Sequence, residues 1–212
     1  MEYTINIKGR LMDLSTPQVM GILNVTPDSF YSGSRKQTEM EIAQRANQII
    51  EEGGSIIDVG AFSTRPGADE VSEEEEGRRL KFALDIVRRE QPDAAVSVDT
   101  YRPTLARKCI EEWGADIIND VSEGGITGIV NVPLEQRQEE YPEMFRVVGE
   151  LKVPYILMSV QPTLETMMKG FAKEVQQLRD LGAKDIILDP GFCFGKNLIQ
   201  NYQIYNEMEK LN

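Results

Sequence analysis

Apolar residues along this chain gather in short runs that end on a polar residue. The plainest run is Ala95-Val-Ser-Val-Asp99, and three others begin on a glycine and share its design: residues 54–58, 114–120 and 182–189. Neighbouring apolar pairs such as Ile56-Ile57 cannot alternate between a buried and an exposed face, so both faces of each strand are expected to be covered. Glycine also suits the left-handed end of a helix. The pattern predicts parallel strands joined by helical crossovers.

The carboxyl ends of such strands form the edge where ligands bind in parallel α/β folds. Five polar residues stand at these ends and are expected to gather there: Asp58, Asp99, Asn119, Asp120 and Asp189. Carboxylates together with an amide suit a flat heterocycle that offers an amino group and a ring N–H to carboxylates, and a carbonyl or ring nitrogen to an amide. Each ring group buried without a partner would cost roughly 1–3 kcal/mol, so matched pairing gives selectivity.

The rest of the chain completes six strand–helix units behind an N-terminal hairpin. The hairpin is expected over Tyr3–Leu14, with its turn at Lys8-Gly9, and is expected to cap one end of the domain. Further strands are expected at residues 19–25 and 155–160. Helices are expected to start near Thr38, Ser72, Arg102, Pro142, Thr163 and Asn197, with Ser72 and Glu75 forming a capping box.

Unit spacing and right-handed crossovers favour a TIM-type (β/α)8 barrel over a doubly wound sheet. Eight units usually need about 250 residues, whereas this sequence has 212. Residues 1–212 are therefore expected to form one barrel domain that holds about six of the eight units and is incomplete at its C-terminus. Its two unpaired strand edges predict association or aggregation of these residues on their own, and hence a possible homo-oligomer.

The composition limits the chemistry. The formal net charge of −12 argues against a nucleic-acid or acidic-membrane surface. Much of that charge lies in Glu73–Glu76, which is expected to be a solvated helix start. Histidine is absent, so His-based catalysis and His-ligated metals are excluded, and any chemistry must use carboxylates, amides, hydroxyls, Lys or Arg.

The cysteines and the N-terminal residues predict a cytoplasmic protein. Cys109 and Cys193 are far apart in the sequence and have no partners at zinc-ligand spacing. Residues 1–13 alternate polar and apolar positions, unlike a signal peptide, and no apolar run approaches the length that a bilayer requires.

Two polar loops follow the first two strands and point to an anion. Donors and cations gather in and before these loops: Asn24, Thr26, Ser29, Ser63, Thr64 and Arg65. They suit an anionic group, and Asn24 could help to hold Mg²⁺ on a diphosphate, because magnesium prefers oxygen ligands. The alternative is that these turn residues satisfy their own backbone.

Five motifs together resemble dihydropteroate synthase. They are Met20-Gly-Ile-Leu-Asn-Val-Thr-Pro-Asp-Ser-Phe30, Ile57-Asp-Val-Gly60 with Ser63-Thr-Arg-Pro-Gly67, Ser97-Val-Asp-Thr100, Ile117-Ile-Asn-Asp-Val121 and Asp189-Pro-Gly191. The first two are specific to that family, whereas the motifs of Asp99 and Asn119 also resemble other pterin-binding barrels, including methyltetrahydrofolate methyltransferases. The resemblance spans nearly the whole chain.

The resemblance implies a barrel that joins 4-aminobenzoate to 6-hydroxymethyl-dihydropterin diphosphate and releases pyrophosphate. Matching positions would bind the pterin through Asp99, Asn119, Met158 and Asp189. Asn24, Thr64 and Arg65 would contact the diphosphate, and Asn24 would also contact Mg²⁺. Asp28, Thr64 and Arg65 would act in catalysis on loops that close over the site, and Pro66 and Phe194 would face the aminobenzoate. A neutral aniline attacks in this reaction, so no strong base is required and the lack of histidine fits.

Several positions depart from the family pattern. Ser159 stands where the family has His, and Val160-Gln-Pro-Thr163 replaces a sequence like Arg-Gly-Thr-Pro. Tyr31-Ser-Gly-Ser34 replaces Ser-Asp-Gly-Gly, Cys193 replaces a glycine, and residues 124–143 are expanded or diverged. The family's seventh strand, with its Ser-Arg-Lys motif, and its eighth, with a basic pair, have no counterpart in these residues. Weak or absent turnover by these residues alone is therefore expected.

Two alternatives to a synthase remain open. One is a catalytically impaired pterin-binding paralogue or interaction protein, which the retained Asp99, Asn119 and Asp189 would serve. The other is folate-dependent methyl transfer, against which the Asp-Ser-Phe and Ser-Thr-Arg-Pro loops argue. In each case the expected partners are small-molecule substrates.

Overall fold

The computed structural model describes residues 3–25, 35–62, 71–124 and 141–211, without the side chains of residues 35–37. Six parallel strands lie side by side in sequence order: β3 (Met20–Asn24), β4 (Ile56–Gly60), β5 (Ala95–Asp99), β6 (Ile117–Asp120), β7 (Tyr155–Met158) and β8 (Ile186–Asp189). The helices between and after them are α1 (Arg35–Glu51), α2 (Glu73–Glu90), α3 (Pro103–Glu111), α4 (Glu143–Leu151), α5 (Leu164–Asp180), α6 (Leu198–Glu207) and the 3-10 helix η3 (Met208–Leu211). The predicted α/β fold of six strand–helix units is confirmed.

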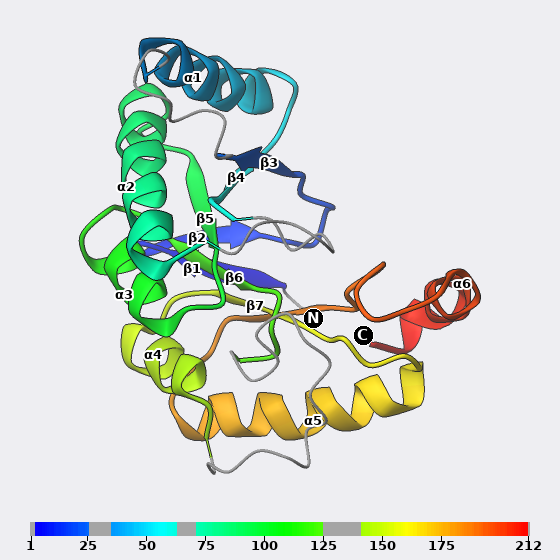
Figure 1. Ribbon diagram of the computed structural model, residues 1–212. Coiled ribbons are helices and arrows are strands. Elements are labelled where there is room, and N and C mark those ends of the chain that lie inside the picture. Colours follow the sequence, from blue (N-terminus) through cyan, green and yellow to red (C-terminus); the bar gives the residue numbers. More distant parts are fainter. Residues whose placement is uncertain (1–2, 26–34, 63–70, 125–140, 212) are drawn as a thin grey trace.

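Helices α1 to α5 form an arc around the outer face of the sheet (Figure 1). Apolar residues fill the space between the sheet and this arc, among them Val59, Leu84 and Val98. Burial on both faces explains why the strands read as continuous apolar runs. Within the described part of the chain, no helix is long and apolar enough to cross a membrane.

A second, smaller core lies on the inner face of the sheet, under the N-terminal hairpin of β1 (Thr4–Ile7) and β2 (Arg10–Asp13). Ile5 and Ile7 of the hairpin pack against strand residues Ile56, Ala95, Ile117 and Ile156. Lys8 at the turn pairs with Asp116 at 2.7 Å. The predicted hairpin, its Lys8-Gly9 turn and its capping role are confirmed.

Helix boundaries differ from the sequence prediction in detail. Helix α1 starts at Arg35, so Thr38 lies inside the helix and is buried instead of capping it. Ser72 caps α2 as predicted by accepting a hydrogen bond from the Glu75 N–H. The predicted capping box is only half formed, because the Glu75 side chain binds Arg78 and Arg79, at 2.8 and 2.7 Å, one turn along the same face.

The expectation that Glu73–Glu76 is a solvated acidic run is wrong for Glu76. Its carboxylate is fully buried and accepts a 2.6 Å hydrogen bond from the Thr100 hydroxyl, with Arg102 at 3.2 Å. The helical period turns this fourth glutamate toward the sheet while Glu73 and Glu74 are exposed. Glu76 thereby holds the segment that follows Asp99.

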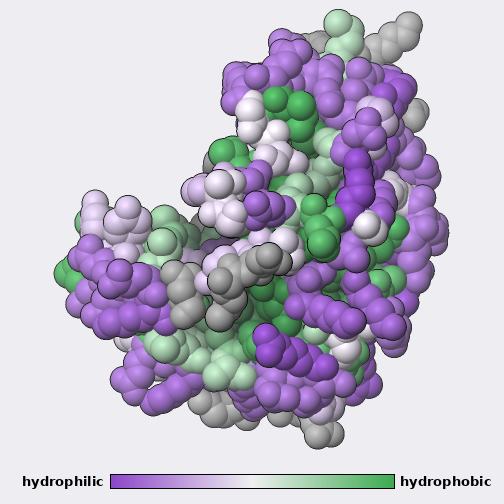
Figure 2. All heavy atoms as spheres, turned by 180° about the vertical axis from the view of Figure 1, so that it is seen from behind, coloured by the Kyte–Doolittle hydropathy of each residue, from purple (hydrophilic) through white to green (hydrophobic). Residues whose placement is uncertain are grey.

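Strands β3 and β8 are the two edges of the sheet. Every residue of β4 is buried, whereas Ile22 of β3 is 59% exposed and β8 is half-buried throughout. The molecular surface is indented between the part that carries α1 and β3 and the projecting helix α6 (Figure 2). Among the described residues, nothing pairs with either edge.

Candidate functional site

The strand register places the predicted site residues in one row. Asn24 pairs with Gly60, Gly60 with Asp99, and Asp99 with Asn119 on successive strands. Side chains two residues apart on a strand share a face. Gly60 and Asp99 lie four residues after the inner-face residues Ile56 and Ala95 on their strands, and Asn119 lies two residues after Ile117. Asn24, Asp99 and Asn119 therefore all point to the inner face, at the carboxyl ends of their strands.

Gly60 leaves the space in which two of these side chains meet. A Cβ at this position would lie 2.7 Å from Asn24 Oδ1 and 3.4 Å from Asp99 Oδ2. A side chain here would move the Asn24 amide away, so glycine leaves room for both oxygens beside β4. The site thus begins with an amide oxygen and a carboxylate oxygen on either side of β4.

Asp58 fixes the orientation of Asn119. The Asn119 amide nitrogen donates to Asp58 Oδ2 at 3.1 Å, which leaves the amide oxygen of Asn119 as an acceptor. Burial raises the pKa of Asp58, and the neighbouring Ser97 hydroxyl and Asn119 amide oppose that shift. The motifs assigned no ligand role to Asp58, although its position two residues before Gly60 already places it on the same face.

Asp99 carries the strongest electrostatic signal of the site. Burial raises its pKa well above the ordinary value, and the charges of Asp58, Asp120 and Glu76 add to the effect. Its Oδ1 is buried with no hydrogen-bond partner in the described part of the chain. Such an acceptor is matched by a ligand N–H, because a buried polar atom without a partner costs free energy.

Met158 and Asp189 form the other side of the site. They are register partners on β7 and β8, and Met158 is fully buried. Asp189 Oδ1 accepts a 2.8 Å hydrogen bond from the Gly191 N–H. Burial raises the pKa of Asp189, whereas that hydrogen bond and the charge of Lys196 lower it. Phe194 lies half-buried in the following loop, where its N–H donates to the Gly191 carbonyl at 3.1 Å.

Asp120 does not join the site as expected. Its carboxylate accepts hydrogen bonds from the Ser122 and Gly124 N–H groups, both at 2.8 Å, and from the Tyr155 hydroxyl at 2.6 Å. Adjacent residues on a strand point to opposite faces, so Asn119 and Asp120 cannot both reach the inner face. Asp120 anchors the loop after β6.

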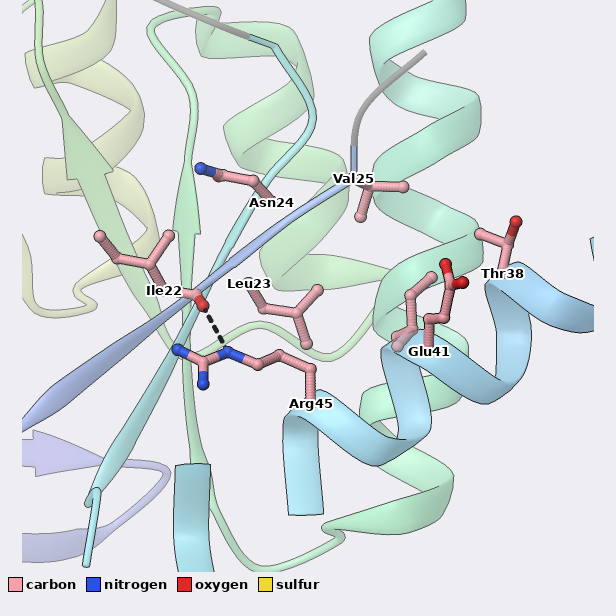
Figure 3. A pocket seen from close by; sticks show the side chains of 8 residues that line it. Ile22, Leu23, Asn24, Val25, Thr38, Glu41 and Arg45 are labelled. Carbon is pink, nitrogen blue, oxygen red and sulfur yellow. Dashed lines mark hydrogen bonds between the residues drawn. The ribbon is translucent and has the colours of Figure 1, made fainter. Parts of the chain in front are cut away.

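The surroundings of Asn24 are visible in Figure 3. Its side chain and that of Ile22 lie on one side of β3, whereas Leu23 and Val25 lie on the other, toward α1. A hollow of about 300 Å³ lies between β3 and α1, and there the Arg45 guanidinium donates to the Ile22 carbonyl at 3.2 Å. The Asn24 side chain is exposed at the edge of the sheet and is accessible to a ligand.

Seven predicted site residues lie outside the described residues: Thr26, Asp28, Ser29, Ser63, Thr64, Arg65 and Pro66. In the described ranges, no group of three or more His, Cys, Asp or Glu side chains could hold a metal ion by itself. Any magnesium at Asn24 would therefore take most of its ligands from substrate and water, as this ion commonly does.

Comparison with known proteins identifies relatives over most of the chain. The family model described as pterin binding enzyme matches residues 20–212. The Escherichia coli K12 dihydropteroate synthase is 36% identical, with 93% of this chain and 69% of that protein aligned.

Solved structures agree with the sequence relatives. Xanthomonas albilineans dihydropteroate synthase with 4-aminobenzoic acid superposes with a TM-score of 0.82 and 30% identity, covering 100% of this chain and 74% of that one. Dihydropteroate synthase from Anaplasma phagocytophilum with bound 6-hydroxymethylpterin-monophosphate gives a TM-score of 0.77 and 30% identity, covering 92% and 74%. These neighbours are TIM barrels, as predicted for this chain. By family match, sequence identity and fold, the chain belongs to the dihydropteroate synthase family of pterin-binding enzymes.

Proposed function

We propose that this chain catalyses the dihydropteroate synthase reaction, in which 6-hydroxymethyl-7,8-dihydropterin diphosphate and 4-aminobenzoate give dihydropteroate and pyrophosphate. The observation that carries the proposal is the row of Asn24, Asp99 and Asn119 on the inner face of the sheet, with Asp189 across from it. Family membership supplies the reaction, and this row supplies a place for the pterin.

The pterin ring matches the polar groups of the site. Its amino and ring N–H groups would donate to the carboxylates of Asp189 and Asp99, and Asn119 offers its amide oxygen as an acceptor. The buried Met158 would pack against the flat ring. Raised pKa values at Asp99 and Asp189 support this assignment, because a carboxylate that is poorly solvated gains most from a bound N–H donor.

The reaction needs positioning more than acid–base catalysis. A C–N bond forms between the aniline nitrogen and the pterin methylene carbon, the C–O bond to diphosphate breaks, and pyrophosphate leaves with the electron pair. The amine then loses a proton to water. Holding the two reactants in line supplies much of the acceleration in such a transfer, and a chain without histidine can do this.

Asn24 is proposed to face the diphosphate together with Mg²⁺. Its amide oxygen and Asp99 Oδ2 converge beside Gly60, and oxygen donors of this kind suit magnesium. When bound, the ion would neutralise charge on the leaving group. We further propose that Asp28, Thr64, Arg65 and Pro66 close over the reacting groups, as the family motifs imply, and that Phe194 faces the aminobenzoate.

We also propose a cytoplasmic location. Cys109 is buried and Cys193 is exposed, and both carry free thiols, a state that a reducing compartment favours. The partners proposed are the two small-molecule substrates.

Pyrophosphate release upon mixing the chain with both substrates and Mg²⁺ tests the function. Weak release by the wild type is expected, and with the pterin diphosphate below its KM it should fall at least tenfold in Asp189→Asn, because a charge-assisted hydrogen bond contributes about 1.5–3 kcal/mol. Asp180→Asn on the exposed end of α5 is the matched control and should leave the rate unchanged. Binding of the pterin diphosphate without release would instead establish a pterin-binding protein that has lost turnover.

A further inference from the structure

We propose that Lys196 is a positioning residue, a half-buried cationic brace that holds the loop after β8 in the form that presents Asp189 and Phe194 to the pterin and the aminobenzoate. The proposal rests on the proposed function. Lys196 itself is not expected to touch either substrate.

All three donors of the Lys196 ammonium group are used by the protein. Its Nζ donates to the carbonyls of Ser159 at 2.8 Å, Gly191 at 3.0 Å and Phe194 at 3.0 Å. An ammonium group has three N–H bonds and no more. Lys196 therefore joins the end of β7 to two points of the loop, and no donor remains for an anionic substrate.

The loop needs such a brace because it runs unusually close to β7. Gly191 has a φ of 60°, and a Cβ there would lie 2.3 Å from the Ser159 carbonyl oxygen. Two carbonyl oxygens, of Ser159 and Gly191, thus converge in a half-buried place where they would repel one another. The ammonium group between them makes the close approach favourable.

A buried carboxylate balances the charge of the brace. Glu123 in the turn after β6 is 1% exposed, and its Oε1 accepts hydrogen bonds from the Ser159 hydroxyl at 2.8 Å and the Val160 N–H at 3.0 Å. Burial lowers the pKa of Lys196 to about 8, while the charges of Glu123, Asp189 and Cys193 act to raise it. Ser159, in the loop after β7, thereby connects the loops after β6 and β8: its hydroxyl donates to Glu123, and its carbonyl accepts from Lys196.

The consequence for the site follows from the chain path. Asp189 lies two residues before the braced Gly191 and hydrogen-bonds to its N–H, and Phe194 is itself braced through its carbonyl. Removing the ammonium group would free both ends of the segment that orients these two side chains. Because Asp189 is expected to hold the pterin equally in the ground state and the transition state, its misplacement should raise KM more than it lowers kcat.

The experiment compares Lys196→Met with Lys169→Met, an exposed lysine on α5 whose partner is Glu165. Calorimetry with the pterin diphosphate and Mg²⁺ is expected to show at least tenfold weaker binding for Lys196→Met, and steady-state rates should show a matching rise in KM with kcat within about threefold. Amide hydrogen exchange of the chain without substrate should rise in residues 190–197 and 159–161. Lys169→Met should behave as wild type in all three.

Unchanged pterin affinity in a folded Lys196→Met would overturn the inference, as would a loss of kcat at constant KM. If Lys196→Met shows no cooperative melting, Lys196→Gln, which has two amide N–H donors but no positive charge, takes its place under the same expectations. A folded wild type that binds no pterin would refute the proposed function, and a role for Lys196 in pterin binding with it. Hydrogen exchange would still decide separately whether Lys196 holds the loop.

Discussion

At the scale of single residues, the proposed role of Asp99 in pterin binding would oppose its contribution to stability. Its carboxylate is buried, one oxygen has no partner within the described ranges, and the charges of Asp58, Asp120 and Glu76 oppose its ionisation. Within the described residues, the free protein therefore maintains an arrangement that a ligand N–H would satisfy. Strain of this kind is common at binding sites, where pKa values are perturbed for function.

Replacing Asp99 with Asn should stabilise the free protein and abolish pterin binding. Removing one unsatisfied buried charge should contribute about 1 kcal/mol, which for a chain of this size raises Tm by about 2–4 °C. Thermal scans and calorimetric titration of the same sample measure both effects. A variant that is less stable than wild type and still binds the pterin would contradict the assignment of Asp99.

The free energy of unfolding that Asp99→Asn gains over the wild type should increase with pH. Below the ordinary Asp pKa of 3.8, both folded and unfolded wild type hold the proton, so the variant and the wild type should be similar. As pH rises, the unfolded chain releases the proton first because the folded pKa is raised, and the wild type loses stability relative to the variant. Denaturant titrations from pH 4 to pH 7 measure this difference, and a constant difference would refute the raised pKa.

At the scale of elements, the loop after β8 depends on one glycine. Gly191 and Gly9 both have positive φ, at 60° and 83°, but a Cβ at Gly9 would meet nothing within 4 Å, whereas one at Gly191 would collide with Ser159 and Met158. Left-handed backbone alone costs an ordinary residue about 1–2 kcal/mol. Comparing substitutions at these two glycines therefore distinguishes the cost of left-handed backbone, which both share, from the cost of a steric collision at Gly191 alone.

Gly191→Ala is expected to destabilise the protein clearly more than Gly9→Ala, by about 1–3 kcal/mol, because the loop must move or the core must overpack. It should also weaken pterin binding, since Asp189 and Met158 adjoin the collision, whereas Gly9→Ala should bind as wild type. Urea unfolding and calorimetry check these outcomes. Equal effects of the two substitutions would show that the close approach is not required.

Much of the site could be predicted from the period of the strands. Alternation places Asp58, Gly60, Asp99 and Asn119 on one face, and the same rule excludes Asp120, which strand-end position alone had grouped with them. Contacts between distant loops could not be predicted, because no local pattern indicates that the Lys196 ammonium group meets the Ser159 carbonyl. Burial of Glu76 escaped prediction since acidic residues usually favour solvent at a helix start.

At the scale of the whole molecule, the sheet has two unpaired edges at β3 and β8 in its described part. Ile22 on β3 and Val19 just before it are 59% and 60% exposed. Exposed parallel edges with apolar side chains favour pairing with another chain. The predicted association of these 212 residues has its physical basis here.

Sedimentation velocity over a range of concentrations should therefore show self-association of the 212-residue chain. Ile22→Lys, which places a charge on the edge strand, should shift the chain toward monomer, whereas Met168→Lys on the exposed side of α5 should not. A wild type that is monomeric at all concentrations and melts sharply would contradict this prediction.

The most direct single measurement is calorimetric titration of the folded wild-type chain with 6-hydroxymethyl-dihydropterin diphosphate and Mg²⁺, with Asp189→Asn titrated in parallel. The inner-face site predicts saturable binding at one site per chain that is lost or at least tenfold weaker in the variant, because the ring would lose its charged acceptor. A folded wild type with no binding, or equal binding by both proteins, would show that the inner face of this sheet is not a pterin site.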